Sequence, residues 1–382
     1  MTKIEKKNWV SKFNLLGEVR LNDNTFQIDN VSTNSNWQYS RMNLCVKCGD
    51  ESGNIYVEMM GGFDNKSSSV IYAHGKTDDG RDDFTQRMQV AWEDRNNPDT
   101  LEQIGELCFI QIGLEKTESG KVFYNKFLSE YDAITYLKET LHDGDKVYVS
   151  GNLKYSIYDG VTQVRKNVTR ITIYTPKEGE TEFKPYAKFT QSILIDKNST
   201  SLKDIDKEKG TMYIHSKVLD YLKELNGVQI KGQYPYSVDF EFKLDLNNKN
   251  LCEAIYKKLF DVKKDWTQIT FDGKFIESGS TTTVTMDDVT DDIKELIEAG
   301  IYTEEEVLKT VAVNGNRERR MVLLKPIITF IGEDDNKVPM VAKFENRYTD
   351  EDLIVDVGVS SSDFDNAIDI SGDDDMDWLN KL

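Results

Sequence analysis

The sequence has no long hydrophobic run and few cysteines. No segment of its 382 residues approaches the roughly 20 consecutive apolar residues that a membrane-spanning helix needs. The first residues, Met1 to Lys7, lack the apolar stretch of a signal peptide. The four cysteines do not show the spacing of a secreted disulfide framework, which fits a reducing compartment. We therefore expect no membrane contact and a cytoplasmic location, in the host cytoplasm if the protein is viral.

The motifs of common enzyme classes are also missing. There is no phosphate-binding loop, no His-Glu-x-x-His zinc motif and no Gly-x-Ser-x-Gly nucleophile turn. Three acidic pairs could in principle hold catalytic magnesium, namely Asp82-Asp83, Asp287-Asp288 and Asp291-Asp292. Each pair lies in a polar segment, where solvated surface charge is the ordinary explanation. We expect no enzyme activity and no cofactor, and nuclease chemistry is the alternative.

The chain is strongly acidic, with a net charge of −19. From Asp350 onward there are eleven acidic residues and one lysine, so this end carries −10 and leaves −9 for the rest of the chain. A nucleic-acid binder needs cations to neutralise phosphate. Any such site must therefore be a local basic stripe on an acidic protein.

Alternation of apolar and polar residues predicts strands in the first third of the chain. The segment from Tyr39 to Cys48 alternates, and after a turn at 49–53 the segment from Asn54 to Met59 alternates again. The two segments together are typical of a β-hairpin with one buried face. The residues predicted to be buried are Met42, Leu44, Val46, Cys48, Ile55, Val57 and Met59.

The elements that follow are in the order of an oligonucleotide-binding (OB) fold. Residues 64–105 are polar and suggest an insertion with one short helix, and 107–128 form a second hairpin. Ser129 can cap a helix, with Asp132 as its reciprocal partner, and two long strands then meet at Asp159-Gly160. Strands, one helix and a final hairpin are the OB order. We predict an OB domain at 1–175 and a polar linker at 176–185.

The same order repeats in the second half of the chain. Gly151, in the middle of a long strand, matches Gly273 at an offset of 122 residues, and the same offset relates Leu137 to Leu259. A glycine inside a strand suits the sharp coiling of a small barrel. We predict a mainly β protein with two tandem OB barrels and helical insertions. The second barrel is predicted at 186–345, with a helical insertion at 287–310 and a last strand at 320–331. A disordered acidic tail is predicted at 346–382.

Aromatic and basic residues share the predicted outward face of the first barrel. Aromatic rings stack on unpaired bases, and lysine and arginine follow the phosphate backbone, so this mixture suits single-stranded nucleic acid. The alternative is that tyrosines favour strands and lysines keep sheets soluble. The predicted DNA-binding residues are Trp37, Tyr39, Arg41, Lys47, Tyr56, Tyr148, Lys154, Tyr158, Arg165, Lys166 and Arg170.

The sequence Cys45-Val-Lys-Cys48-Gly has the spacing of a zinc knuckle. Tetrahedral zinc needs four ligands, and the remaining cysteines and three histidines include no second close pair. On a regular strand Cys45 would point outward and Cys48 inward. We therefore predict no metal site and a buried Cys48.

The tail ends in a polyanion joined to apolar residues. Its predicted partner-binding residues are Asp373, Asp374, Asp375, Asp377, Trp378 and Leu379. A flexible acidic segment steers partners electrostatically, and the Trp-Leu pair offers a pocket something to bind. It could also occupy the protein's own DNA groove. The alternative is a tail that only keeps the protein soluble.

OB barrels followed by an Asp-rich tail with an apolar tip resemble bacterial and phage single-stranded-DNA-binding proteins. The resemblance covers residues 13–175, extends more weakly over 185–344, and includes the tail residues from Asp373 to Leu379. The chain departs from the bacterial pattern because it ends in Asn-Lys-Leu instead of Asp-Ile-Pro-Phe and lacks a Gly/Gln/Pro-rich linker. These departures favour a divergent phage or viral type.

The resemblance implies a protein that protects single-stranded DNA during replication, recombination or repair. It also implies that the tail recruits replication proteins such as a polymerase, a helicase or primase, or a recombinase. The second hypothesis is a non-catalytic interaction protein whose acidic barrels bind other proteins, and the charge of −9 outside the tail favours it.

Overall fold

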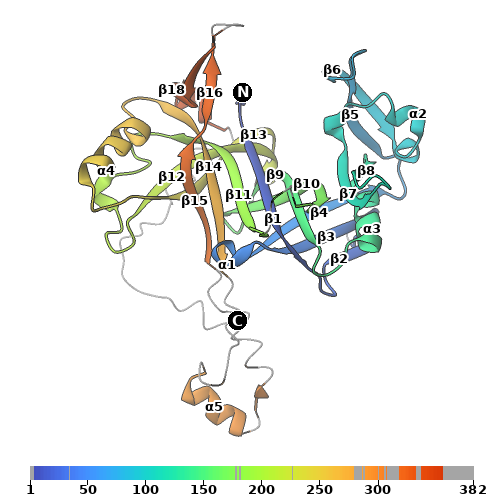
Figure 1. Cartoon of the computed structure of the whole chain (residues 1–382), viewed down its shortest axis with the longest axis horizontal. Helices are drawn as coiled ribbons and strands as arrows, with labels where there is room; N and C mark the ends of the chain where they lie inside the picture. The colour runs from blue at the N-terminus through green and yellow to red at the C-terminus, as the bar shows by residue number, and fades with distance from the viewer. Residues whose placement is uncertain are drawn as a thin grey trace.

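The computed structural model is mainly β (Figure 1). It describes residues 4–33, 35–176, 179, 182–225, 227–278, 286, 289–299, 301–304, 307, 318–332 and 337–355. The predicted partner-binding residues at 373–379 lie outside these ranges, as do residues 287, 288, 300, 305, 306 and 308–310 of the predicted insertion at 287–310. Within that insertion the structure describes helix α5 (Asp291–Glu298). No helix in the described part is long and apolar enough to cross a membrane.

The first half of the chain forms a closed five-stranded barrel. Going round it, β1 pairs with β3, β3 with β4, β4 with β10, β10 with β9, and β9 again with β1. Only the β4–β10 pairing is parallel, which is the strand order of an OB fold, and helix α3 stands between the third and fourth barrel strands. The elements are β1 (Ser11–Arg20), β3 (Trp37–Lys47), β4 (Asn54–Asp64), α3 (Glu130–Thr140), β9 (Lys146–Tyr158) and β10 (Val161–Ile173).

Side-chain alternation explains why these segments form the barrel. The inward residues predicted for β3 and β4 are all buried, and Met42, Leu44 and Ile55 have no exposed surface. Helix α3 begins where Ser129 accepts the backbone N–H of Tyr131. Asp132 does not complete this cap as predicted, because it forms an ion pair with Arg95 at 2.7 Å.

The second half repeats the barrel. Strand β11 pairs with β12 and β14, β12 with β13, and β14 with β15, while β13 and β15 are parallel. The elements are β11 (Tyr186–Ile195), β12 (Thr211–Leu225), β13 (Val228–Lys243), α4 (Lys249–Ile255), η4 (Tyr256–Phe260), β14 (Trp266–Ser278) and β15 (Glu318–Pro326). The prediction of two OB barrels is confirmed.

The two barrels match residue by residue at their tightest point. Gly151 lies opposite Phe13, and Gly273 lies opposite Phe189. A Cβ on Gly151 would collide with the backbone oxygen of Asn167, and one on Gly273 would collide with the ring of Phe189. The last strand of each barrel also bulges by one residue opposite the glycine. The bulge and the glycine together let a long strand coil sharply enough to close a small barrel.

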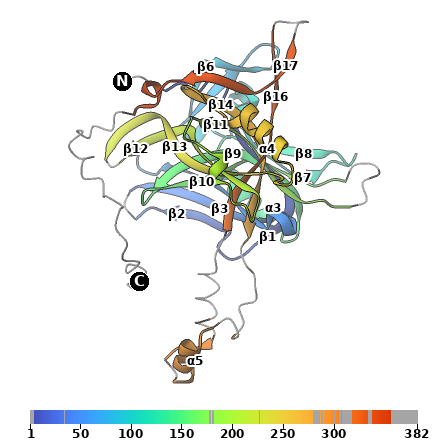
Figure 2. The ribbon, with the colours of Figure 1, turned by 90° about the vertical axis from the view of Figure 1, so that its left-hand side faces the viewer.

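The first strands of the two barrels pair with each other. Strands β1 and β11 are antiparallel, with Phe13 opposite Phe189, so an approximate two-fold axis relates the barrels at this pair. Buried residues of both barrels join in one hydrophobic cluster. Figure 1 shows β1, β11 and β14 side by side in the centre of the molecule, and Figure 2 shows the same ribbon turned by 90°.

Two buried carboxylates also join the barrels. Glu277 of β14 forms an ion pair with Lys166 of β10, and both side chains are about nine-tenths buried. Asp220 of β12 accepts the backbone N–H of Tyr155 in β9 at 3.0 Å and lies 3.3 Å from Lys6. Burial lowers the pKa of Lys6, although Asp220 acts in the opposite direction. The barrels are therefore held together by polar contacts as well as by their shared core.

A side arm stands between β4 and α3. It was predicted as a polar insertion with one short helix, but residues 65–109, called the arm from here on, contain a β-hairpin as well. The prediction missed the hairpin because only one of its faces is buried, against Ile104 and Phe109, and three extra residues of β6, between Asp83 and Arg87, break its alternation. The elements of the arm are β5 (Val70–Lys76), β6 (Asp82–Ala91), η1 (Trp92–Asp94), α2 (Pro98–Leu101) and η2 (Glu106–Cys108). A second hairpin, formed by β7 (Ile110–Lys116) and β8 (Val122–Phe127), follows the arm.

The end of the second barrel differs from the sequence expectation in two ways. The predicted strand at 320–331 is interrupted after Pro326, and a separate hairpin follows. The segment predicted to be disordered from 346 is ordered as far as 355, because Tyr348 and Leu353 are buried with Ile4 and Trp266. The remaining elements are β2 (Phe26–Val31), α1 (Gly49–Ser52), η3 (Leu202–Asp204), β16 (Ile328–Ile331), β17 (Val338–Val341), β18 (Lys343–Tyr348) and η7 (Glu351–Leu353).

Candidate nucleic-acid interface

Five of the predicted DNA-binding residues lie on the outer surface of β3, β4, β9 and β10. Tyr39 and Arg41 alternate with buried residues of β3, and the outward face of β4 carries Tyr56. Arg165 of β10 lies opposite Lys154 of β9, and both side chains are about half exposed. We call this surface, together with Glu58 and Asn167, the first-barrel face.

Glu58 controls the charge of the first-barrel face. Its carboxylate lies 3.9 Å from Arg41 and 3.8 Å from Arg165. Two guanidinium groups thus share one carboxylate, which leaves one positive charge to meet a phosphate. Lys154 contributes less, because its ammonium lies 3.6 Å from the buried carboxylate of Asp220.

Four other predicted residues are placed at the margins of this surface. Trp37 is half-buried at the beginning of β3, and Tyr158 is 77% exposed at the turn between β9 and β10. Tyr148 packs against Tyr174, with ring centroids 5.6 Å apart. Lys47 lies at the far end of β3, where it lines a smaller groove with Tyr186.

The outward orientation predicted for Lys166 is wrong, and Cys45, which was predicted on the outward face, is buried. Lys166 is only 8% exposed and is neutralised by Glu277. Neighbouring residues of a strand point to opposite faces, so Arg165 and Lys166 cannot both face solvent. Cys45 is 5% exposed, and burial raises the pKa of the neighbouring Cys48 thiol. No group of three histidine, cysteine or acidic side chains is arranged to hold a metal ion in the part of the chain that the structure describes.

A larger groove follows the seam between the barrels. It has a volume of about 970 Å³, and the paired strands β1 and β11 form its floor with Lys12, Asn14, Lys188 and Thr190. Strands β9 and β10 form one side and β14 and β15 the other, while the arm closes one end. The side chains that line these walls are Glu106, Leu107, Phe109, Gln111, Ser150, Asn152, Thr169, Arg170, Asp272, Leu324 and Lys325. We call this the central groove.

The acidic residues of the central groove already have partners, whereas most of its cations are available. Glu106 forms an ion pair with Lys126 at 2.8 Å, and Asp272 accepts the hydroxyl of Thr190 at 2.8 Å. Among the described residues, no carboxylate lies within ion-pair distance of Lys12, Lys188 or Lys325. The groove is therefore a local basic site on an acidic protein, as a phosphate backbone requires.

Aromatic rings lie beside these cations. The ammonium of Lys188 is 4.6 Å from the ring centroid of Tyr186, and the guanidinium of Arg170 is 5.5 Å from that of Tyr124. Arg170 also donates a hydrogen bond to Gln111, which holds the guanidinium at the wall of the groove. Rings and cations in alternation can stack bases and follow phosphates at the same time.

Arg170 is the one predicted DNA-binding residue that lines the central groove. Sequence reasoning missed Lys12, Lys188 and Lys325, although one signal was present. Lys12-Phe-Asn and Lys188-Phe-Thr are copies of one motif, 176 residues apart, at the strands that pair across the two-fold axis. The groove and the first-barrel face join at Asn152, which lies opposite both Lys12 and Asn167.

A cysteine, a histidine and an aspartate meet in the arm. His74 Nε2 lies 2.7 Å from Asp82 Oδ1, and Cys108 Sγ lies 3.2 Å from His74 Nδ1 and 3.8 Å from Nε2. Because both ring nitrogens lie within 3.8 Å of the sulfur, the sulfur is over the face of the ring instead of along a nitrogen lone pair. Burial also raises the pKa of Cys108. This geometry does not activate a nucleophile, which requires an in-line hydrogen bond to the base.

Comparisons with known proteins give few matches. A family model described as YorF matches residues 110–295, from β7 to α5. No curated protein sequence matches. The solved structures that are similar include the wild-type single-stranded DNA binding protein from Thermus aquaticus, with 10% identity and a TM-score of 0.31 over 71% of this chain and 87% of that chain. A deletion mutant of that protein has 9% identity and a TM-score of 0.32 over 73% and 89%. TM-scores this low support no conclusion about function, and the OB fold rests on the strand order above.

Proposed function

We propose that this protein binds single-stranded DNA without catalysis and with little base preference. The observation that carries the proposal is the central groove, where lysines of both barrels line a seam together with polar and apolar side chains. Backbone phosphates would lie along Lys12, Lys188 and Lys325, and bases would stack on Tyr39 and Tyr56 of the first-barrel face. Such contacts recognise the backbone and the flat faces of bases, so they are tolerant of sequence.

A second candidate function is protein binding by the acidic barrels. Glu58 favours it, because this carboxylate neutralises half of the arginine charge on the first-barrel face. The two functions differ in their response to salt, since each phosphate contact releases counterions from DNA.

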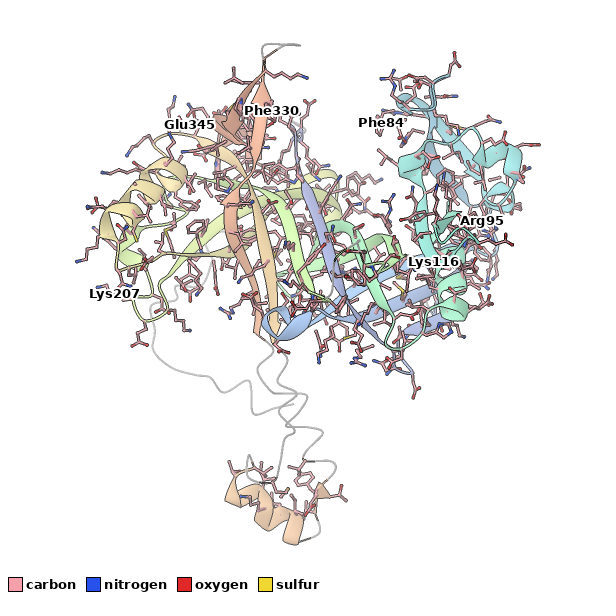
Figure 3. All side chains as sticks on the ribbon, viewed as in Figure 1. Phe84, Arg95, Lys116, Lys207, Phe330 and Glu345 are labelled. Carbon is pink, nitrogen blue, oxygen red and sulfur yellow. The ribbon has the colours of Figure 1, made fainter. Side chains whose placement is uncertain are left out.

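The test is fluorescence anisotropy with a labelled oligothymidylate, as a single strand and as a duplex, at low and high salt. We expect preference for the single strand and a steep loss of affinity with salt. Lys12→Glu with Lys188→Glu should lower affinity by roughly a hundredfold at low salt and reduce the salt slope by about two. Lys207→Glu is the matched control, since Lys207 is exposed in the loop before β12, away from the groove (Figure 3). Equal binding of duplex, or no binding at low salt, would reject the proposal.

We further propose that residues 356–382 recruit replication proteins and compete with DNA for the basic groove. Deleting this segment should raise affinity for single-stranded DNA, mostly at low salt, because it removes a competing polyanion. Trp378→Ala should abolish capture of replication proteins from a cell extract without changing DNA affinity, since it alters no charge. A truncation that weakens DNA binding would contradict the competition.

A further inference from the structure

The hairpin β16–β17 has a composition unlike the rest of the molecule. Charged residues make up 30% of the chain, yet none occurs from Pro326 to Gly332 or from Val338 to Ala342. Four of its apolar side chains are more than half exposed: Ile328 67%, Phe330 62%, Ile331 51% and Val338 58%. The hairpin projects from the body, and Phe330 lies on its outer part (Figure 3). An exposed apolar hairpin of this kind marks an interaction surface.

The two strands form a sheet of their own, so each has an outer edge without a neighbour among the described residues. The hydrogen-bond pattern shows which residues face outward. Ala342 N–H donates to Ile327 O, and bonded and non-bonded pairs alternate in an antiparallel ladder. Ile328 and Phe330 therefore direct their backbone groups away from β17, and Pro339, opposite Phe330, directs its ring nitrogen away from β16.

The two edges consequently differ. Proline has no N–H, so Pro339 removes a donor from the outer edge of β17 and blocks strand addition there. The outer edge of β16 keeps its donors and acceptors in the uncharged sequence Ile328-Thr-Phe-Ile331. A long apolar edge of high β propensity without a charge or proline is a template for another strand.

We propose that this edge binds β16 of a second copy of the chain. Ladder geometry requires outward residues to pair with outward residues. The register in which both outward residues of β16 pair with outward residues of the partner's β16 puts Ile328 opposite Phe330 of the partner copy and the two-fold axis at Thr329. The strand is then complementary to itself, as a closed dimer requires. Two chains of net charge −19 repel each other over most of their surfaces, and the uncharged strands of this hairpin are a place where they can approach. The product is a four-stranded sheet.

The axis position gives a sharp test in the full chain. Thr329 would lie opposite Thr329 of the partner copy as a non-hydrogen-bonded pair, with the two Cα atoms about 4.5 Å apart. A disulfide can span this Cα–Cα distance. Thr329→Cys should form a covalent dimer under mild oxidation. Val338→Cys, on the blocked strand of the same hairpin, should form no covalent dimer, and neither should the wild type.

Sedimentation velocity provides the second arm of the test. The wild type should associate to dimers as its concentration rises, whereas Phe330→Asp and Ile328→Pro should sediment as monomers with unchanged circular dichroism. Phe84→Asp is the control, because Phe84 is an equally exposed phenylalanine (65%) on the arm. A wild type that stays monomeric at high concentration, or crosslinking of Val338→Cys as readily as Thr329→Cys, would overturn the proposal.

Discussion

The two barrels keep the same skeleton but carry different outer surfaces. Both close around a glycine opposite a phenylalanine, and both keep an Arg–Glu pair at equivalent positions of the third and last barrel strands. These pairs are Arg165–Glu58 at 3.8 Å and Arg320–Glu241 at 3.2 Å. The registers agree, because Glu58 lies opposite Asn167 and Glu241 opposite Val322, two residues beyond each arginine.

The difference lies in what surrounds that pair. In the first barrel Tyr56 lies opposite Cys45, and at the matching place in the second barrel Asp239 lies opposite His215, 2.8 Å away. The second barrel therefore presents a carboxylate where the first presents an aromatic ring. Barrel closure constrains inward residues and glycines, whereas outward residues are free to diverge. We infer that the first barrel supplies base stacking and the second supplies one wall of the central groove.

The largest expected effect on stability comes from breaking the buried ion pair between the two barrels. Glu277→Leu should lower the free energy of unfolding by about 3–5 kcal/mol, because it leaves the Lys166 ammonium buried without a counterion. Adding Lys166→Met should restore most of this loss. Urea unfolding measures both, with Asp239→Asn as the exposed control. Equal stability of the single and double variants would mean that the pair does not join the barrels.

The next effect compares the two equivalent glycines. Gly151→Ala should cost about 3 kcal/mol, because the new Cβ meets the fixed backbone of Asn167. Gly273→Ala should cost about 1–2 kcal/mol, since the obstructing Phe189 ring is a side chain that can shift. Thermal unfolding of the two variants gives the order. The reverse order would show that the barrels are not closed in the same way.

The smallest effect concerns the outer surfaces. Tyr39→Ala should weaken single-stranded DNA binding by about 1–3 kcal/mol and leave the melting temperature nearly unchanged, because it removes one stacking platform. Tyr213→Ala, on the matching strand of the second barrel, should change affinity by less than about 0.5 kcal/mol. Anisotropy titrations with both variants decide whether the barrels differ in function. Similar losses would place DNA on both outer surfaces.

Local patterns determined much of the fold. Alternation along β3 and β4, the Ser129 cap and the Asp159-Gly160 turn specify elements that form between neighbours in the chain, so the OB order could be predicted. The match of Gly151 with Gly273 was visible because barrel closure tolerates no side chain there. The arm hairpin and the ordered segment up to 355 were missed, because their few buried residues leave no regular period.

The central groove was decided by tertiary structure alone. Its floor exists because β1 pairs with β11, strands more than 160 residues apart in the sequence, and no local pattern states which strand edges will meet. The bulge at Thr169 is the clearest case. The alternation that turns Arg165 outward turns Lys166 inward and would bury Arg170 as well, but the extra residue shifts the alternation and brings Arg170 to the surface. Charge and alternation in the sequence thus indicated which basic residues lie on the outward side of a strand, and the register between distant strands decided which basic residues face the groove.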